Sequence, residues 1–479
     1  TAGNSYQPHP GSLKRTADME LASGLNRFVI HTSVHQPMDN LMPGFSLGPF
    51  GQWFTRQETW ANQARVWGDY LGRSSYLLQE GKNVADILYY YGENYNITAL
   101  CQDALPKIPA GYEFDFVNSS ALKDAISASN KKLVSKGGTS YQILYLDASA
   151  QKMTLGTLNR VFTLAKEGIL IGGTAPEASP SLSDNVDTYS QVLTQLKSLP
   201  NVQFGKDLDN VLTSKGVSPD VHITQNSAEI LFQHRTNGEK EIYWLNSRTE
   251  NENSAQLSFR VSGKIPKLWN PETGEISSIS YETKGGRTII PYSFKPWDAI
   301  FIVFDGETKQ QKLSIPSLKI ASTKTIESPW KVAFQKERSA PAEMTLTVLQ
   351  SLDQQADPGV KYFSGEATYT NKFEVNSIAK GERVQIDLGD VKNLAEVYIN
   401  GKFVQTLWKK PFVVDITDKF KIGRNTLEVK VINSWVNRLV GDAQPGAKKI
   451  TFIPMPVIRA DSKTEPSGLL GPVKINILN

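Results

Sequence analysis

Apolar and polar positions in the first 30 residues predict a helix followed by a strand. After His9-Pro10-Gly11 the pattern predicts a helix of about 13 residues that ends near Gly24, because a glycine is favoured just beyond a helix C-terminus. Next, the apolar triplet Phe28-Val29-Ile30 predicts a short buried strand over residues 27–31. A polar run that starts at His31 leaves the carboxyl end of this strand.

A second helix is expected from about Gln57, after a long loop rich in proline, glycine and aromatic residues. Its predicted apolar stripe consists of residues at helical spacing, Trp60, Ala64, Trp67 and Leu71. This spacing places Trp67 in the core, whereas Trp60, beside the loop, is open to a core or a ligand-binding role. Helix, strand, loop and helix is the order of a (β/α) barrel. A complete barrel needs about 250 residues, so residues 1–82 would supply only its end.

Strands and helices alternate in residues 83–218. The predicted strands contain the sequences VADILYYYG, EFDFV, YQILYLD and GILIGG, with helices over 153–166 and 184–198. This alternation indicates a parallel sheet of flavodoxin or Rossmann type. Gly172-Gly173-Thr174 follows a strand, but no dinucleotide or P-loop motif surrounds it, so we interpret it as a structural turn.

The second half of the chain is dominated by short alternating strands. Residues 219–312 predict an antiparallel β-sandwich, and residues 326–479 predict a further all-β domain in which Asn400-Gly401 marks a hairpin. The fold class is therefore multidomain α/β plus all-β. Its predicted parts are a barrel end, an α/β domain and two β-domains.

Composition excludes several classes of protein. The net charge of +4 comes from 52 basic and 48 acidic residues without a basic block, which argues against nucleic acid as a partner. No apolar run reaches the length of a membrane span. The single cysteine, Cys101, excludes an internal disulfide and leaves the compartment open. Because the chain begins at Thr1 without an initiator methionine, we expect a piece of a longer protein or a processed form.

Polar and aromatic residues cluster between residues 31 and 60. In α/β folds, polar groups after the carboxyl ends of strands are where ligands bind, and flat aromatic faces beside hydrogen-bonding groups suit sugars. The alternative is a core strand followed by ordinary turn residues. The candidate ligand-binding residues are His31, His35, Gln36, Trp53, Arg56 and Trp60.

Long motifs in the chain resemble one family. HPGSLKRTAD, GLNRFVIHTSVHQP, PGFSLGPFGQWFTRQETW and YLGRSSYLLQEGKNVADILYYYGE resemble the C-terminal part of the catalytic domain in glycoside hydrolase family 106, the α-L-rhamnosidases. The last 150 or so residues resemble a galactose-binding-like jelly roll, in IDLGDVKNLAEVYINGKFVQTLW and LEVKVINSWVNRLVGD. The resemblance implies hydrolysis of terminal α-L-rhamnose from plant or microbial glycans with inversion, and a calcium ion in the sugar site. Inversion needs two carboxyl groups, which the family pattern would place upstream of Thr1.

By this resemblance, the six candidate residues would form the wall that binds the terminal sugar. His9 is a weaker candidate at a loop-to-helix junction. Glu58 is interpreted as a helix N-terminal charge and Glu93 as a turn or domain-boundary residue, so neither is assigned as acid or base. The signature from Asn433 to Leu439 is interpreted as interdomain scaffold, with a buried Arg438–Asp442 pair, although it could also hold a glycan.

Three hypotheses of function remain open from the sequence. The first is an α-L-rhamnosidase completed by an N-terminal companion segment, in the periplasm or outside a bacterial cell. The second is a non-catalytic fragment that binds glycans or scaffolds a partner. The third, a nucleotide-binding regulator built on residues 84–213, has almost no motif support.

Overall fold

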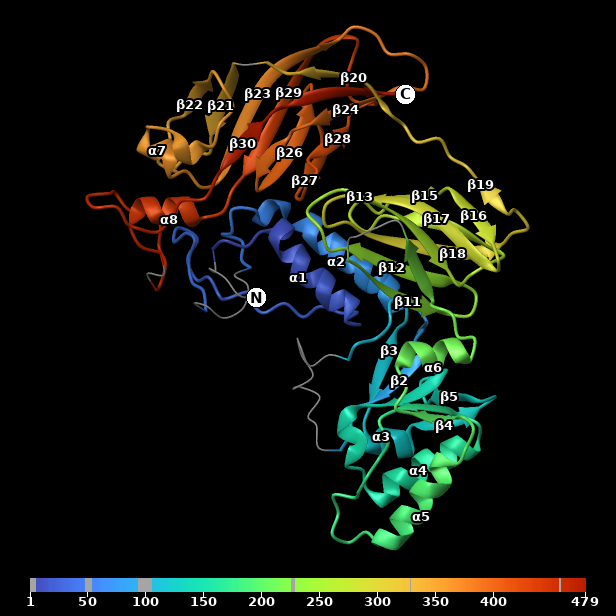
Figure 1. Ribbon diagram of the computed structural model, residues 1–479. Coiled ribbons are helices and arrows are strands. Elements are labelled where there is room, and N and C mark those ends of the chain that lie inside the picture. The colour runs from blue at the N-terminus through green and yellow to red at the C-terminus, as the bar shows by residue number, and fades with distance from the viewer. Residues whose placement is uncertain (1–5, 48–53, 94–105, 225–228, 328, 456–457) are drawn as a thin grey trace.

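The computed structural model describes residues 6–47, 54–93, 106–224, 229–327, 329–455 and 458–479. Candidate residue Trp53 and Cys101 lie outside these ranges. Figure 1 shows an α/β domain, two β-rich domains and a pair of helices between them. The helices are α1 Pro10–Ala22, α2 Ala64–Leu78, α3 Ser119–Asp124, α4 Leu155–Lys166, α5 Val186–Lys197, α6 Leu208–Ser214, α7 Pro358–Lys361 and α8 Val436–Asp442, with 3-10 turns η1 Ala61–Gln63, η4 Ala148–Gln151 and η5 Leu352–Gln354.

The first predicted helix is confirmed by α1. It has 13 residues, and Gly24 follows its C-terminus with a φ of 93°, a conformation that glycine adopts without strain. The predicted helix from Gln57 is wrong at its start. Residues before Trp60 form turns, and the α-helix α2 begins only at Ala64 after one 3-10 turn.

The predicted buried strand over residues 27–31 is also wrong. This segment belongs to no sheet in the described part of the chain, and the Val29 side chain is 94% exposed. A strand needs a neighbour to take its backbone hydrogen bonds. None of the described strands pairs with residues 27–31, so the apolar triplet has no sheet to enter.

Five parallel strands form the α/β domain. The sheet order is β3-β2-β7-β8-β9, in which the first strand in the chain lies between the second and the third, as in doubly wound folds. A small antiparallel sheet, β4-β5-β6, lies beside it. The strands are β2 Ile87–Tyr90, β3 Phe114–Val117, β4 Ile126–Ser129, β5 Lys132–Ser135, β6 Ser140–Tyr141, β7 Ile143–Leu146, β8 Leu170–Gly173 and β9 Val202–Phe204.

Gly173 ends β8 in a close structural turn, as the sequence predicted. A Cβ on this glycine would lie 2.1 Å from the carbonyl oxygen of Leu146, and its φ is 91°. No helix starts at this turn, because α5 begins only at Val186. The geometry therefore has none of the features of a phosphate-binding turn.

Two antiparallel sheets form the sandwich that follows. Their orders are β1-β11-β12-β18-β14-β15 and β10-β13-β17-β16-β19. The strands are β1 Lys82–Asn83, β10 Val221–Thr224, β11 Ile230–Thr236, β12 Glu241–Ser247, β13 Asn253–Phe259, β14 Lys264–Trp269, β15 Ile276–Ser278, β16 Tyr281–Lys284, β17 Arg287–Phe294, β18 Ala299–Glu307 and β19 Lys312–Leu313.

The central strands of the six-stranded sheet are buried on both faces. In β12, Tyr243 and Leu245 face the second sheet, whereas Ile242 and Trp244 pack against α1 and α2. Strand side chains alternate between faces, so a strand covered on both sides is apolar throughout. The helix pair therefore covers the outer face of this sheet (Figure 1).

The last domain contains sheets of six, four and two strands. Their orders are β22-β21-β23-β29-β26-β27, β20-β31-β24-β28 and β25-β30. The strands are β20 Ile320–Thr325, β21 Trp330–Phe334, β22 Glu343–Leu346, β23 Glu366–Val375, β24 Arg383–Asp387, β25 Asp390–Lys392, β26 Leu394–Ile399, β27 Lys402–Leu407, β28 Val413–Asp415, β29 Gly423–Ile432, β30 Gly468–Gly471 and β31 Lys474–Leu478. Its Leu394, Trp408 and Ile432 join the core around α1 and α2.

A buried histidine lies in the sandwich, close to its boundary with the α/β domain. His234 Nδ1 lies 2.6 Å from Asp220 and Nε2 lies 3.2 Å from Glu241. Burial acts against the charged ring, but these two carboxylates outweigh it and raise the pKa of His234 above 6.5. Burial acts to raise the pKa of Glu241, but hydrogen bonds from His234, Thr236 and Lys264 outweigh it and lower this pKa to about 2. Arg260 pairs with Asp86 at 3.0 Å and extends the network across the domain boundary.

We expect His234→Gln to lower the melting temperature more at pH 6 than at pH 9. The protonated His234 ring, held by its two carboxylates, stabilises the folded state. This contribution is fully present below pH 6.5 and is lost as pH rises through the raised pKa of the folded state. Melting curves from pH 5 to 9 measure the difference. His222→Gln, which replaces the exposed histidine on β10, is the matched control. A deficit of His234→Gln that does not change with pH would contradict this account.

Candidate active site

A buried carboxyl group lies in a hollow at the start of the second helix. The hollow measures about 260 Å³ and is lined by Ser33, Phe54, Thr55, Arg56, Glu58, Trp60, Ala61 and Ala64. Glu58 is 5% exposed. Its Oε1 accepts a hydrogen bond from the backbone N–H of Thr59 at 2.8 Å, while Oε2 is buried without a partner in the described part of the chain. A buried oxygen without a partner is uncommon, and a catalytic role is one explanation of it.

Burial also controls the charge of this group. It raises the pKa of the Glu58 carboxyl well above its ordinary value, and the hydrogen bonds from Thr59 only partly oppose this shift. The protonated form is therefore favoured. The sequence-based interpretation of Glu58 as a helix N-terminal charge is wrong, because η1 begins three residues later and α2 six residues later.

The candidate residues before Glu58 lie on an extended loop. His31 and His35 are exposed, and no described side chain holds either ring in place. Gln36 is 6% exposed, and its amide both donates to and accepts from the backbone of Phe45, at 2.6 and 2.9 Å. The Gln36 amide thus fixes the loop.

Arg56 and Trp60 bind neighbouring segments. The Arg56 guanidinium donates to Asp39 at 2.6 Å and to the carbonyl of Gln36 at 2.8 Å, and its side chain is 54% exposed. Trp60 is buried, and its Nε1 donates to the carbonyl of Pro8 at 3.2 Å. One part of the Trp60 ring lines the hollow and contacts Phe54 edge-on at 5.4 Å between centroids.

The C-terminal domain supports this loop from behind. Trp435, fully buried, donates from Nε1 to the carbonyl of Gln57 at 2.9 Å, directly before Glu58 in the chain. The Arg338 guanidinium lies 4.3 Å above the Trp435 ring. A second contact joins the backbones of Met42 and Phe452 at 2.7 Å. These contacts cannot be predicted from local sequence, because Gln57 and Trp435 are 378 positions apart.

The other predicted side chains have structural partners. The Glu93 carboxylate accepts from the backbone N–H and hydroxyl of Thr154 at the start of α4. The predicted buried pair of Arg438 and Asp442 is confirmed, at 2.9 Å. His9 lies immediately before α1, and a Gly11 Cβ would contact its ring at 3.2 Å.

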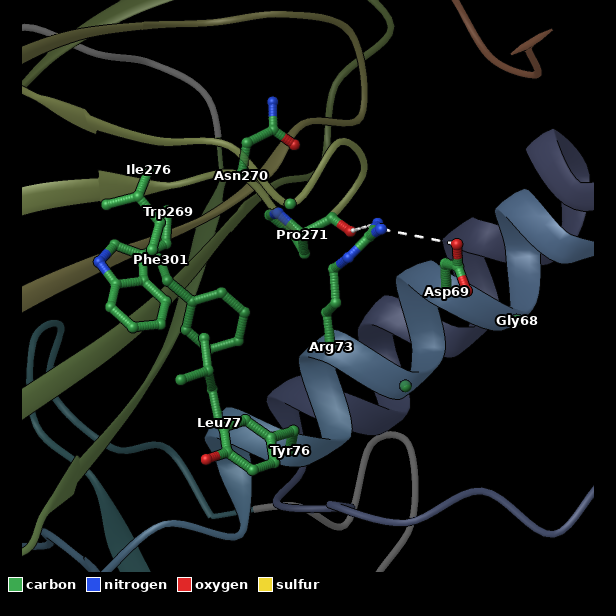
Figure 2. A pocket seen from close by; sticks show the side chains of 12 residues that line it. Gly68, Asp69, Arg73, Tyr76, Leu77, Trp269, Asn270, Pro271, Ile276 and Phe301 are labelled. Atoms are coloured by element: carbon green, nitrogen blue, oxygen red, sulfur yellow. Dashed lines mark hydrogen bonds and ion pairs between the residues drawn. The ribbon is translucent and has the colours of Figure 1, made fainter. Parts of the chain in front are cut away.

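A second hollow, of about 450 Å³, lies between α2 and the edge of the sandwich (Figure 2). Its wall is mostly apolar, with Trp269, Ile276 and Phe301 on one side. The Arg73 guanidinium pairs with Asp69 on the same helix and donates to the carbonyl of Pro271 across the hollow (Figure 2). Asp69 is the one carboxyl group among the described residues that line this hollow, so the hollow does not suit hydrolysis by a pair of acids.

Comparison with known proteins assigns the family. A family model described as alpha-L-rhamnosidase, of glycoside hydrolase family 106, matches residues 1–283, more than half of the chain. The chain belongs to this family. A second family model, the galactose-binding-like domain of glycosyl hydrolase family 2, matches residues 351–459. The family 106 chain is therefore a multidomain α/β and β-rich protein with a galactose-binding-like domain.

Two relatives extend the comparison. The solved structure of a rhamnosidase from Novosphingobium sp. PP1Y has 41% sequence identity and a TM-score of 0.92, and the match covers 98% of this chain and 46% of that one. A protein from Formosa agariphila, named as a candidate β-glucuronidase, is 24% identical over the whole of this chain and 62% of its own length. This chain thus spans less than two thirds of either relative.

No group of three or more histidine, cysteine, aspartate or glutamate side chains lies close enough to hold a metal ion in the described ranges. Among the described helices, none is both long and apolar enough to cross a bilayer.

Proposed function

We propose that this chain is part of an inverting α-L-rhamnosidase that removes terminal α-L-rhamnose from plant or microbial glycans. Family membership supports the reaction, and the buried Glu58 carboxyl is the observation that supports the site. Glycosidases of this type use a carboxylic acid to protonate the leaving oxygen and a carboxylate to activate water, about 6.5–9.5 Å apart.

We assign the general acid to Glu58. Its raised pKa favours the proton that the leaving oxygen needs, and Oε2, which has no partner among the described residues, donates this proton to the glycosidic oxygen of a sugar bound in the hollow. The second carboxylate then comes from the segment upstream of Thr1 that the family pattern implies. Calcium stays an expectation from the family resemblance, and no step here depends on it.

The sugar contacts in this proposal come from the hollow around Glu58 and from the loop before it. The exposed His31 and His35, on the loop that contributes Ser33 to the hollow, hydrogen-bond sugar hydroxyls, Arg56 binds a hydroxyl, and Trp60, in the wall of the hollow, packs against the rhamnose methyl group. The Gln36 amide acts indirectly, by holding the loop. Trp53 completes the predicted set.

A companion segment is the further part of this proposal. Five large apolar side chains of α1 and the loop that follows it are exposed, namely Met19, Val29, Ile30, Met38 and Leu47. Exposed apolar surface of this kind suits a covering segment. We propose that residues 27–31 become a barrel strand when the companion segment supplies neighbours, and that α1 and α2 are the last helices of a (β/α)8 barrel.

The finer domain assignments belong to the same proposal. We assign residues 1–82 to the barrel end, 83–218 to a flavodoxin-like domain, 219–312 to a β-sandwich and 326–479 to a galactose-binding-like jelly roll. The strand order of the parallel sheet supports the second of these. A periplasmic or extracellular location would suit an enzyme that acts on glycans.

The alternative is a β-glucuronidase, because the Formosa agariphila relative carries that name. The experiment compares aryl α-L-rhamnoside with aryl β-D-glucuronide as substrates of the complete enzyme, meaning this chain joined to the companion segment. We expect cleavage of the rhamnoside only, with β-L-rhamnose as the first product seen by NMR. Cleavage of the glucuronide would favour the alternative, and α-L-rhamnose as first product would exclude inversion.

A further inference from the structure

A larger cleft is lined by residues of α1, the sandwich and the C-terminal domain. These three parts lie next to one another in Figure 1. Its volume is about 630 Å³, within the usual range for small-molecule sites of roughly 300–1,000 Å³. Its wall carries five basic side chains, Lys14, Arg15, Lys392, Lys409 and Lys410, and one carboxylate, Glu250. The cleft involves different side chains from the hollow around Glu58.

Two of these lysines, Lys392 and Lys410, share one carboxylate, so their positive charge is not fully paired. Lys392 and Lys410 both lie near Asp390, with their Nζ atoms 3.0 and 3.9 Å from the same Oδ1. One carboxylate therefore serves two cations. The Lys410 side chain is 59% exposed, so its charge is available to a ligand. An anion in the cleft would complete the pairing.

The buried lysines of the cleft, Lys14 and Lys409, form ion pairs with carboxylates that do not line it. Lys14 pairs with Asp18 at 2.6 Å, and Lys409 pairs with Glu272 at 3.2 Å and lies 3.9 Å from Asp298.

Two buried polar atoms of the wall lack hydrogen-bond partners in the described structure. They are Nδ1 of His9 and Nε1 of Trp297. The Trp297 ring lies 4.1 Å from the Arg15 guanidinium, and its backbone is left-handed, with a φ of 52°. Unpartnered buried groups and strained backbone are uncommon and are concentrated at functional sites.

We propose that this cleft binds an acidic oligosaccharide, with a uronate carboxylate held by Lys392 and Lys410. The volume exceeds what a small inorganic anion needs, and Ser12, Asn251 and Asn393 add groups that hydrogen-bond hydroxyls. Trp297 offers an aromatic edge for a sugar ring. The choice of a sugar rests on membership of a glycoside hydrolase family, not on the assignment of Glu58. The cleft would hold the enzyme on polysaccharides that carry uronic acids.

The test is binding of trigalacturonate to the 479-residue chain by isothermal titration calorimetry. The methyl-esterified trisaccharide is the matched ligand without charge, and inorganic sulfate tests the anion alone. We expect the Kd for trigalacturonate to be at least about tenfold lower than for the ester or sulfate. Hydrolysis plays no part in this measurement, so an inactive chain can still bind.

Two variants test whether trigalacturonate binds at Lys392 and Lys410. Lys392→Gln and Lys410→Gln should each weaken trigalacturonate binding by about fivefold or more, since a charge-assisted hydrogen bond is lost. Lys402→Gln, an exposed lysine on β27, should leave it unchanged. Equal affinity for the acid and its ester, sulfate binding as tight as trigalacturonate, or equal effects of the Lys410 and Lys402 variants would each overturn the proposal.

Discussion

Replacing Glu58 with glutamine is expected to lower kcat on an oligosaccharide α-L-rhamnoside by about a thousandfold, because general acid catalysis contributes roughly 10²–10⁴. Glutamine keeps the size of the side chain but cannot supply the proton. KM should change little, since Glu58 acts on the leaving oxygen. Initial rates of the complete enzyme and of the variant measure the effect. An aryl rhamnoside with a dinitrophenol leaving group needs little protonation, so its rate should fall far less.

The matched control is Glu20→Gln, an exposed glutamate on α1. It should retain full activity on both substrates. An equal loss for both substrates with Glu58→Gln would assign Glu58 to the base that activates water. Full activity of Glu58→Gln would remove Glu58 from the mechanism.

The second large effect is expected in stability. Lys14→Met should lower the free energy of unfolding by about 3–5 kcal/mol, because a buried charge loses its partner. Lys14 and Asp18 are both fully buried, with Nζ 2.6 Å from Oδ2, and Lys14 also donates to the carbonyl of Trp297. Asn246 of the sandwich donates to the same Oδ2 at 2.9 Å. The pair thus fixes α1 against the sandwich.

Urea denaturation followed by tryptophan fluorescence measures this loss. The double variant Lys14→Met/Asp18→Asn should recover much of it, since it removes the unpaired charge as well. Lys197→Met, on the exposed face of α5, should change stability little. If the double variant lost as much as the sum of both single variants, the two charges would not act as a pair.

Much of the fold could be predicted from periodicity. The apolar runs in β12 and β18 and the alternation in β13 each gave the correct element, because burial on one or both faces leaves a direct pattern. The predicted buried strand at residues 27–31 failed for the opposite reason. Its apolar triplet has the pattern of a strand, but pairing depends on a neighbour that the described residues do not supply.

The site was less accessible to sequence reasoning. Glu58 stands just before an apolar stripe, where an acidic residue is usually an exposed charge at a helix N-terminus. The sequence therefore did not indicate that Glu58 is buried. That burial depends on contacts from remote parts of the chain, such as the bond from Trp435 to the carbonyl of Gln57. In contrast, Arg438 and Asp442 are four positions apart on α8, so their ion pair could be predicted from local spacing.

The most direct test of the whole account is hydrolysis of an aryl α-L-rhamnoside, with this chain alone and with the companion segment added. The account predicts no turnover by the folded chain alone, because the second carboxylate is supplied by the companion. It predicts turnover in the complete enzyme, which Glu58→Gln removes when the leaving group is an oligosaccharide. A folded, complete enzyme that leaves α-L-rhamnosides intact would contradict the assignment of this chain to rhamnose hydrolysis.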